Sequence, residues 1–96
     1  MQDDGFVSCA HTEPFDTPGW VKPSPSSKDE CTDCHAIGEN FWAHLRICLT
    51  CGHVACCDSS PRRHAHAHAD QAGHPVMRSF EPGESWRWCY VDERIV

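Results

Sequence analysis

Two pairs of cysteines with CxxC spacing constrain this chain most: Cys31 with Cys34, and Cys48 with Cys51. The tight turn between two such thiolates brings both sulfurs to about 2.3 Å from one tetrahedral Zn²⁺. A disulfide would have to join side chains across the same tight turn, and neither pair lies at the mouth of a βαβ unit, as a thioredoxin-like site would. Two pairs followed by further cysteine and histidine therefore predict metal sites.

Because the chain is short, we expect these metals to stabilise its fold. Its 96 residues, 40% of them hydrophobic, form one small domain with little core to offset the chain entropy lost on folding. Eight cysteines indicate either a disulfide framework in a secreted protein or metal sites in a reducing compartment. The start, "MQDDGFVSCAH", lacks the basic and apolar regions of a signal peptide, and no stretch approaches the roughly 18 apolar residues of a membrane span. We therefore expect a cytoplasmic, zinc-stapled protein without a membrane partner.

Turn and strand signals organise the chain. Residues 1–8 are expected to be a flexible N-terminus, and residues 12–30, with four prolines and three serines, a loop. Four segments have the pattern of short strands: 44–48, 53–57, 74–80 and 85–91. The first two flank a turn that holds the second CxxC pair, so they predict a hairpin built around a metal site.

One helix is expected, in the stretch "SSPRRHAHAHADQAG". Ser60 is the candidate N-cap, Pro61 the first helical residue and Gly73 the stop. With the four strands, this helix predicts an α+β fold: a small zinc-stapled domain with an antiparallel sheet and one main helix.

The histidines of this helix differ in the direction they face. Positions four apart share one face, so His64 and His68 point the same way, while His66 points to the opposite side. His74 follows the helix stop and can return its imidazole toward the helix end. We therefore expect His64, His68 and His74 to be metal ligands and His66 to be solvated.

Further ligands are available along the chain. They are the CxH pair of Cys9 and His11, one of the adjacent Cys56 and Cys57, and Cys89. With the CxxC pairs and three histidines this makes eleven, whereas three tetrahedral sites need twelve. Asp92 stands three residues after Cys89, and a carboxylate oxygen is an acceptable zinc ligand. The alternative is that Asp92 is a surface acid, so two or three Zn²⁺ ions are expected.

The order "CxH … CxxC … CxxCGxxxC … HxxxHxxxxxHP … WCYxx" resembles the ubiquitin-specific-protease type zinc finger, or UBP finger. The resemblance implies a domain over residues 9–92 with a C-terminal tail at 93–96, and zinc sites that are cross-braced because their ligands interleave along the chain. It implies three ligand sets: Cys9, His11, Cys89 and Asp92; Cys31, Cys34, Cys56 and His64; and Cys48, Cys51, His68 and His74. The segment before His64 is one residue longer than the family pattern, which leaves Cys57 as an alternative to Cys56.

Many UBP fingers bind the free C-terminal diglycine tail of ubiquitin in a pocket of aromatic residues and one arginine. Here Asp58 stands where the family has that arginine, and Arg46 where an aromatic residue is expected, so the pocket is altered. A carboxylate tail would be repelled unless Arg46, Arg62 or Arg63 compensates. Strand alternation places Trp88 and Tyr90 on one face, either as an aromatic platform for a ligand or as core.

The stretches "HLRxCxxCGHVxCCDSSPxRHA" and "FEPGExWRWCYVDE" are shared with stand-alone bacterial proteins of this type, a resemblance that implies a bacterial source and makes ubiquitin a doubtful ligand. The formal net charge of −6 disfavours nucleic acid as a partner.

The expected function is therefore that of a monomeric, non-catalytic module with no catalytic residues. It would bind a protein segment or C-terminal peptide through Trp88, Tyr90, Arg46 and Arg62. The alternative is a small zinc hydrolase or thiol redox protein that uses an incompletely coordinated site.

Overall fold

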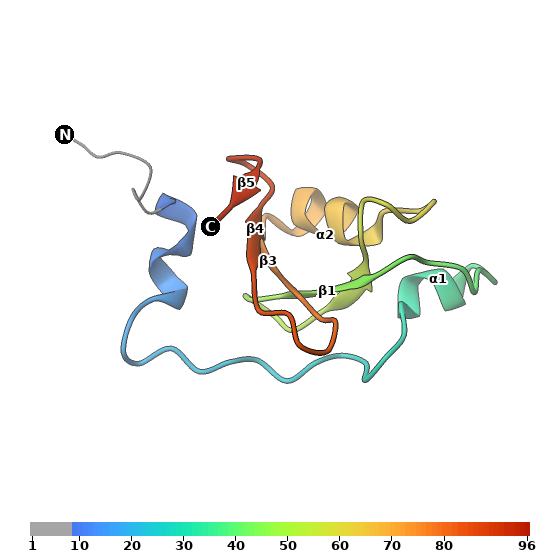
Figure 1. Ribbon diagram of the computed structural model, residues 1–96, viewed down its shortest axis with the longest axis horizontal. Coiled ribbons are helices and arrows are strands. Elements are labelled where there is room, and N and C mark those ends of the chain that lie inside the picture. The colour runs from blue at the N-terminus through green and yellow to red at the C-terminus, as the bar shows by residue number, and fades with distance from the viewer. Residues whose placement is uncertain (1–8) are drawn as a thin grey trace.

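A five-stranded antiparallel sheet forms the framework of the computed structural model, which describes residues 9–96 (Figure 1). The strand order is β2-β1-β3-β4-β5. The strands are β1 Leu45–Cys48, β2 Val54–Cys56, β3 Val76–Ser79, β4 Arg87–Cys89 and β5 Arg94–Ile95. This confirms the predicted α+β class, whereas the flexible segment expected at residues 1–8 lies outside the described residues.

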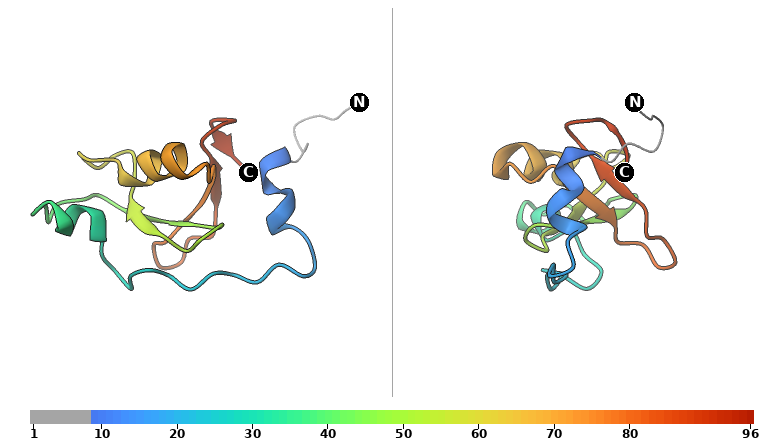
Figure 2. Two further views of the ribbon diagram at one scale, coloured as in Figure 1. Left: turned by 180° about the vertical axis from the view of Figure 1, so that it is seen from behind. Right: turned by 90° about the vertical axis from the view of Figure 1, so that its left-hand side faces the viewer.

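Among residues 9–96 there are three short helices: η1 Ala10–Phe15, α1 Thr32–Ala36 and α2 His64–Ala72. Helix α2 packs against β1, β2 and β3, and α1 packs against β2. Figure 2 shows η1 at the opposite end of the molecule from α1, joined to it by a long extended segment. This segment carries the chain from one end of the sheet to the other. Cys9 and the first CxxC pair therefore lie at opposite ends of the molecule.

The main helix begins later than the sequence predicts. Residues 61–63 are not helical, and Arg63 precedes the helix in a left-handed conformation with φ 46°. Ser60 is not the N-cap, because its hydroxyl accepts a hydrogen bond from the Ala43 N–H instead. The His64 N–H, the first of the helix, donates to the Cys56 sulfur at 3.1 Å. A contact from a distant strand therefore replaces the local cap, while Gly73 ends the helix as predicted, with φ 70°.

Two elements carry no strong sequence signal. The 3₁₀ helix η1 occupies the start of the predicted loop, and the loop after Phe15 has no helix or strand up to the first CxxC pair. Strand β5 lies in the segment that the sequence assigns to a C-terminal tail, yet Ile95 pairs with Trp88 and Arg94 pairs with Cys89. Two residues are too few to show a period, so only pairing with β4 defines this strand.

The core is built largely from cysteine. Seven of the eight cysteines are buried, Cys51 being the exception, so thiols share the interior with a few larger apolar side chains such as Val54, Val76 and Met77. One buried cluster combines Cys31, Cys34, Cys48 and Cys56 with aliphatic residues of β1 and β2, and a smaller one contains Cys9 and Cys89. Such a core provides little hydrophobic stabilisation by itself.

Candidate metal centres and an aromatic pocket

Twelve side chains gather in three clusters of four, and the ligand atoms within each cluster lie within 4.8 Å of one another. Cluster 1 is Cys31, Cys34, Cys56 and His64; cluster 2 is Cys48, Cys51, His68 and His74; cluster 3 is Cys9, His11, Cys89 and Asp92. The structure thus brings together the same three sets that the family resemblance implies.

Cluster 1 joins α1, β2 and α2. Cys31 precedes α1, and its sulfur accepts the Cys34 N–H at 3.4 Å, the turn geometry that CxxC spacing predicts. The His64 Nδ1 lies 3.4 Å from the Cys31 sulfur, 3.3 Å from the Cys34 sulfur and 3.6 Å from the Cys56 sulfur. A tetrahedral zinc with bonds of about 2.0 Å to nitrogen and 2.3 Å to sulfur places these atoms roughly 3.5 Å apart. The spacing of cluster 1 therefore matches a tetrahedral zinc site.

Cluster 2 joins the hairpin turn to the end of α2. Cys48 ends β1, and the Cys51 sulfur lies 3.4 Å from the His68 Nε2. The Cys48 sulfur lies 3.5 Å from the Nδ1 of His74, which the chain brings back after Gly73. Since His64 and His68 lie one turn apart on α2, this single helix supplies a ligand to each of clusters 1 and 2.

Cluster 3 ties the N-terminal part of the described chain to its C-terminal part. The His11 Nδ1 lies 3.3 Å from the Cys9 sulfur, 3.5 Å from the Cys89 sulfur and 3.7 Å from Asp92 Oδ1. The Asp92 N–H donates to the Cys89 sulfur at 3.4 Å, as a CxxC turn would, with a carboxylate in place of the second thiol. Asp92 is also within 4.0 Å of the Arg94 guanidinium.

Crowding of buried thiols is the common electrostatic feature of these clusters. Burial, with further contributions from Asp92 and Cys89, raises the pKa of the Cys9 thiol to about 12. Burial and the neighbouring Cys31 and Cys56 thiols also raise the Cys34 pKa. Several thiolates cannot share one buried site without a cation, so the donor set has the chemistry of a zinc centre.

Cys57 is the one cysteine outside the clusters. It follows directly after β2, where successive side chains point to opposite faces, and its sulfur lies 3.6 Å from the Ser60 hydroxyl. Burial by itself would raise the Cys57 pKa, but hydrogen bonds from Ser60 and from the backbone of Ser59 and His44 lower it. Of the two adjacent cysteines, the structure places Cys56 in the cluster.

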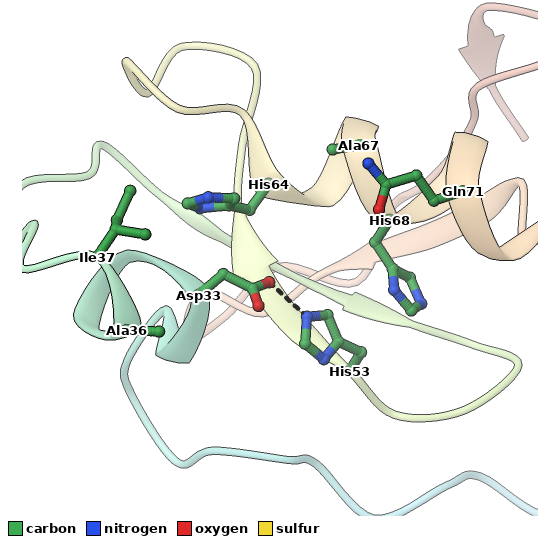
Figure 3. A pocket seen from close by; sticks show the side chains of 8 residues that line it. All are labelled: Asp33, Ala36, Ile37, His53, His64, Ala67, His68 and Gln71. Carbon is green, nitrogen blue, oxygen red and sulfur yellow. Dashed lines mark hydrogen bonds and ion pairs between the residues drawn. The ribbon is translucent and has the colours of Figure 1, made fainter.

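A histidine–carboxylate pair between clusters 1 and 2 escaped the sequence analysis. Asp33 and His53 face each other (Figure 3). They line a hollow of about 390 Å³, together with His64 and His68. The His53 Nε2 lies 2.6 Å from Asp33 Oδ2, and the His53 ring stacks on His68 at 4.5 Å. The only sequence feature that could have indicated this pair is its position, because Asp33 lies inside the first CxxC pair and His53 follows the second. The pair links α1 to the hairpin and restricts the orientation of His68.

Trp88 and Tyr90 line a second hollow of about 480 Å³ between α2 and the end of β4. Its other lining residues are Asp58, His66, Asp70 and Glu93. His66 belongs to none of the three clusters; its Nδ1 lies 3.5 Å from Asp58 Oδ1 and its Nε2 lies 3.5 Å from Asp70 Oδ2. We call this hollow the acidic aromatic pocket.

The arginines expected at this pocket do not line it. The Arg46 guanidinium lies 4.4 Å from the centre of the Trp86 ring, and its Nε and one Nη are buried without a hydrogen bond. Arg62 forms an ion pair with Glu39 at 3.8 Å. Among residues 9–96, the lining of the pocket therefore contains aromatic rings and carboxylates but no arginine, while Arg62 and Arg63 line an adjoining hollow with His66 and Asp70.

Comparison with known proteins identifies the domain. The model of the family described as the Zn-finger in ubiquitin-hydrolases and other protein matches residues 31–96. The chain belongs to this family of UBP fingers. The three clusters of possible metal ligands agree with a zinc finger of this type.

Two curated relatives contain a similar finger within much longer chains. Ubiquitin carboxyl-terminal hydrolase 44 of Ailuropoda melanoleuca is 38% identical over 69 residues, which cover 72% of this chain and 9% of the hydrolase. BRCA1-associated protein of Homo sapiens is 36% identical over 67 residues, covering 70% of this chain and 10% of that protein. The chain thus spans about a tenth of the length of the curated relatives it matches.

A solved structure has a similar fold. The solution structure of protein RPA1320 from Rhodopseudomonas palustris superposes with a TM-score of 0.75 at 45% identity, over 93% of this chain and 80% of that one. In the part of the chain that the structure describes, no helix is long and apolar enough to cross a membrane.

Proposed function

We propose that this UBP finger binds three Zn²⁺ ions, one in each cluster, and that Asp92 completes the third site. The observation that carries the proposal is the gathering of twelve donor atoms into three sets of four at distances suited to tetrahedral zinc. The ions replace the hydrophobic core that a chain of this size lacks, since metal binding energy becomes folding energy in small metal-stapled domains.

Native mass spectrometry of the zinc-saturated protein tests this stoichiometry. We expect three zinc ions in the wild type and two in Asp92→Ala. The matched control is Asp29→Ala, because Asp29 is an exposed aspartate outside the clusters, and this variant should keep three. Two ions in the saturated wild type would overturn the three-zinc proposal, and three in Asp92→Ala would remove Asp92 from the ligand set.

We infer that all three zinc ions are structural, so that the module is non-catalytic. Each cluster supplies four protein ligands, whereas a hydrolytic zinc keeps one position open for water. The alternative, a zinc hydrolase or thiol redox protein, depends on cluster 3, whose Asp92 is exposed. Substitution by Co²⁺ separates the two: azide should leave the visible spectrum of closed sites unchanged, and an azide-dependent shift would show an open position.

We propose further that the acidic aromatic pocket binds a protein segment. Trp88 and Tyr90 flank Cys89, so cluster 3 fixes the strand that presents both rings. The carboxylates of Asp58, Asp70 and Glu93 disfavour a free C-terminal carboxylate, which keeps ubiquitin a doubtful partner. The thiolate ligands require a reducing compartment such as the cytoplasm, and the module is proposed to act as a monomer.

A random peptide array probed with the zinc-loaded protein tests this binding surface. Peptides that use the pocket should be lost in Trp88→Ala and retained in Phe41→Ala, because Phe41 is an exposed aromatic residue outside the pocket. An array on which Trp88→Ala binds the same peptides as the wild type would refute the proposed surface.

A further inference from the structure

The acidic aromatic pocket combines two aromatic rings with three carboxylates. Its three carboxylates come from separate segments: Asp58 follows β2, Asp70 lies on α2 and Glu93 precedes β5. Within residues 9–96, Asp58 and Asp70 pair only with the imidazole of His66, and Glu93 forms no ion pair. The fold thus brings three carboxylates to one hollow whose own lining contains no lysine or arginine, although Arg62 and Arg63 line an adjoining hollow that shares His66 and Asp70 with it.

Unused hydrogen-bonding capacity borders the same hollow. The Tyr90 hydroxyl is buried and makes no hydrogen bond among the described residues, and the buried His66 Nδ1 has only the longer 3.5 Å contact with Asp58 Oδ1. A buried polar atom without a partner costs about 1–3 kcal/mol, so a ligand that supplies N–H donors here gains more than it would at a satisfied surface.

The aromatic rings suit a cation. An ammonium group is attracted to the face of tryptophan or tyrosine within about 6 Å of the ring centre, and more strongly when it is partly desolvated. This chain already contains one such contact, between Arg46 and Trp86 at 4.4 Å. Trp88 and Tyr90 line the open hollow, where the His66 ring lies 4.9 Å from the Tyr90 ring, and among residues 9–96 no lysine or arginine lies over either ring.

We infer that the acidic aromatic pocket binds a primary ammonium group of the partner protein. This group belongs to a lysine side chain, which lies between the two rings of Trp88 and Tyr90 on one side and the carboxylates of Asp58, Asp70 and Glu93 on the other. This inference rests on the proposed function, that the pocket binds a protein segment. An ammonium group carries three donors and one compact charge, which matches three carboxylates arriving from different directions. The charge of this ammonium ligand is opposite to that of the C-terminal carboxylate that many UBP fingers bind. The difference follows from Asp58, which stands where the family has an arginine.

Titration of zinc-loaded protein with short capped peptides tests the inference. The probes are Ac-Gly-Gly-Lys-Gly-Gly-amide, the same peptide with norleucine in place of lysine, and a glycine peptide amide whose only charged group is a free N-terminal amine. At low ionic strength, with binding followed by tryptophan NMR shifts, we expect the lysine peptide to bind at least tenfold more tightly than the norleucine peptide. Equal affinity for the two would overturn the inference. Tighter binding of the free-amine glycine peptide than of the lysine peptide would identify an N-terminus, not a lysine, as the ligand.

Charge reversal gives a second, independent measurement. Asp58→Asn should weaken the lysine peptide several-fold, and Asp58→Arg should abolish its binding and favour a peptide with a free C-terminal carboxylate. The control Asp29→Asn should leave both affinities unchanged. If array peptides lost in Trp88→Ala show no enrichment in lysine, the ammonium inference fails while the proposed binding surface stands; if Trp88→Ala loses no peptide, the surface itself fails.

Discussion

Replacing Gly52 by alanine tests how the second CxxC turn is held in place. Gly52 adopts φ +84°, and a Cβ added there would lie 2.1 Å from the Ser24 carbonyl oxygen and 3.3 Å from the Pro23 Cβ. A left-handed conformation costs an L-residue about 1–2 kcal/mol. The clash adds to this cost, because the obstacle is a backbone carbonyl that cannot rotate away.

The Ser24 segment is itself tied to the turn. The Ser26 N–H donates to the Gly52 carbonyl at 2.9 Å, and the Ser26 hydroxyl accepts the Val54 N–H at 2.8 Å. If the segment withdraws to admit the Cβ, both bonds are lost, at about 1 kcal/mol each. We expect Gly52→Ala to lower the free energy of unfolding by about 3–4 kcal/mol, much of the stability of a small domain.

Gly83→Ala is the matched control. Gly83 has φ +82°, but a Cβ there meets nothing within 4 Å, so this variant carries only the conformational cost. Urea unfolding of the zinc-loaded proteins compares the two, and zinc release to a colorimetric chelator should be faster in Gly52→Ala because Cys51 is adjacent. Equal destabilisation of both variants would refute the claim that the contact with Ser24 holds the turn.

The remaining predictions concern the metal clusters. His64→Ala and His68→Ala should each lose one zinc by native mass spectrometry, whereas His66→Ala should keep the wild-type number and change stability by less than about 1 kcal/mol, because its contacts are half-exposed ion pairs. Loss of zinc from His66→Ala would contradict the cluster assignment. Cys56→Ala should lose one zinc and Cys57→Ala none; the reverse result would exchange their roles. Excess chelator should unfold the domain, which retention of the native circular dichroism spectrum would disprove.

Local spacing determined a large part of this fold. The CxxC pairs, the CxH pair and the i, i+4 relation of His64 and His68 each fix a short-range geometry that survives in any tertiary context. Four of the five strands and the Gly73 stop were predicted for the same reason, since alternation and positive φ are properties of a few neighbouring residues. The pairing of ligands into three sets came from resemblance to a family, because spacing alone does not say which distant turns meet.

Tertiary structure decided what depends on contacts between distant segments. The choice of Cys56 over Cys57 follows from the face of β2 that meets α1 and α2, and the delayed start of α2 follows from the contact between the His64 N–H and the Cys56 sulfur. Arg46 lies on Trp86 rather than in the pocket because the β1–β3–β4 pairing places it there. The charge of the acidic aromatic pocket arises in the same way: Asp58 alone was visible as a departure from a pattern, whereas its convergence with two further carboxylates exists only in the folded chain.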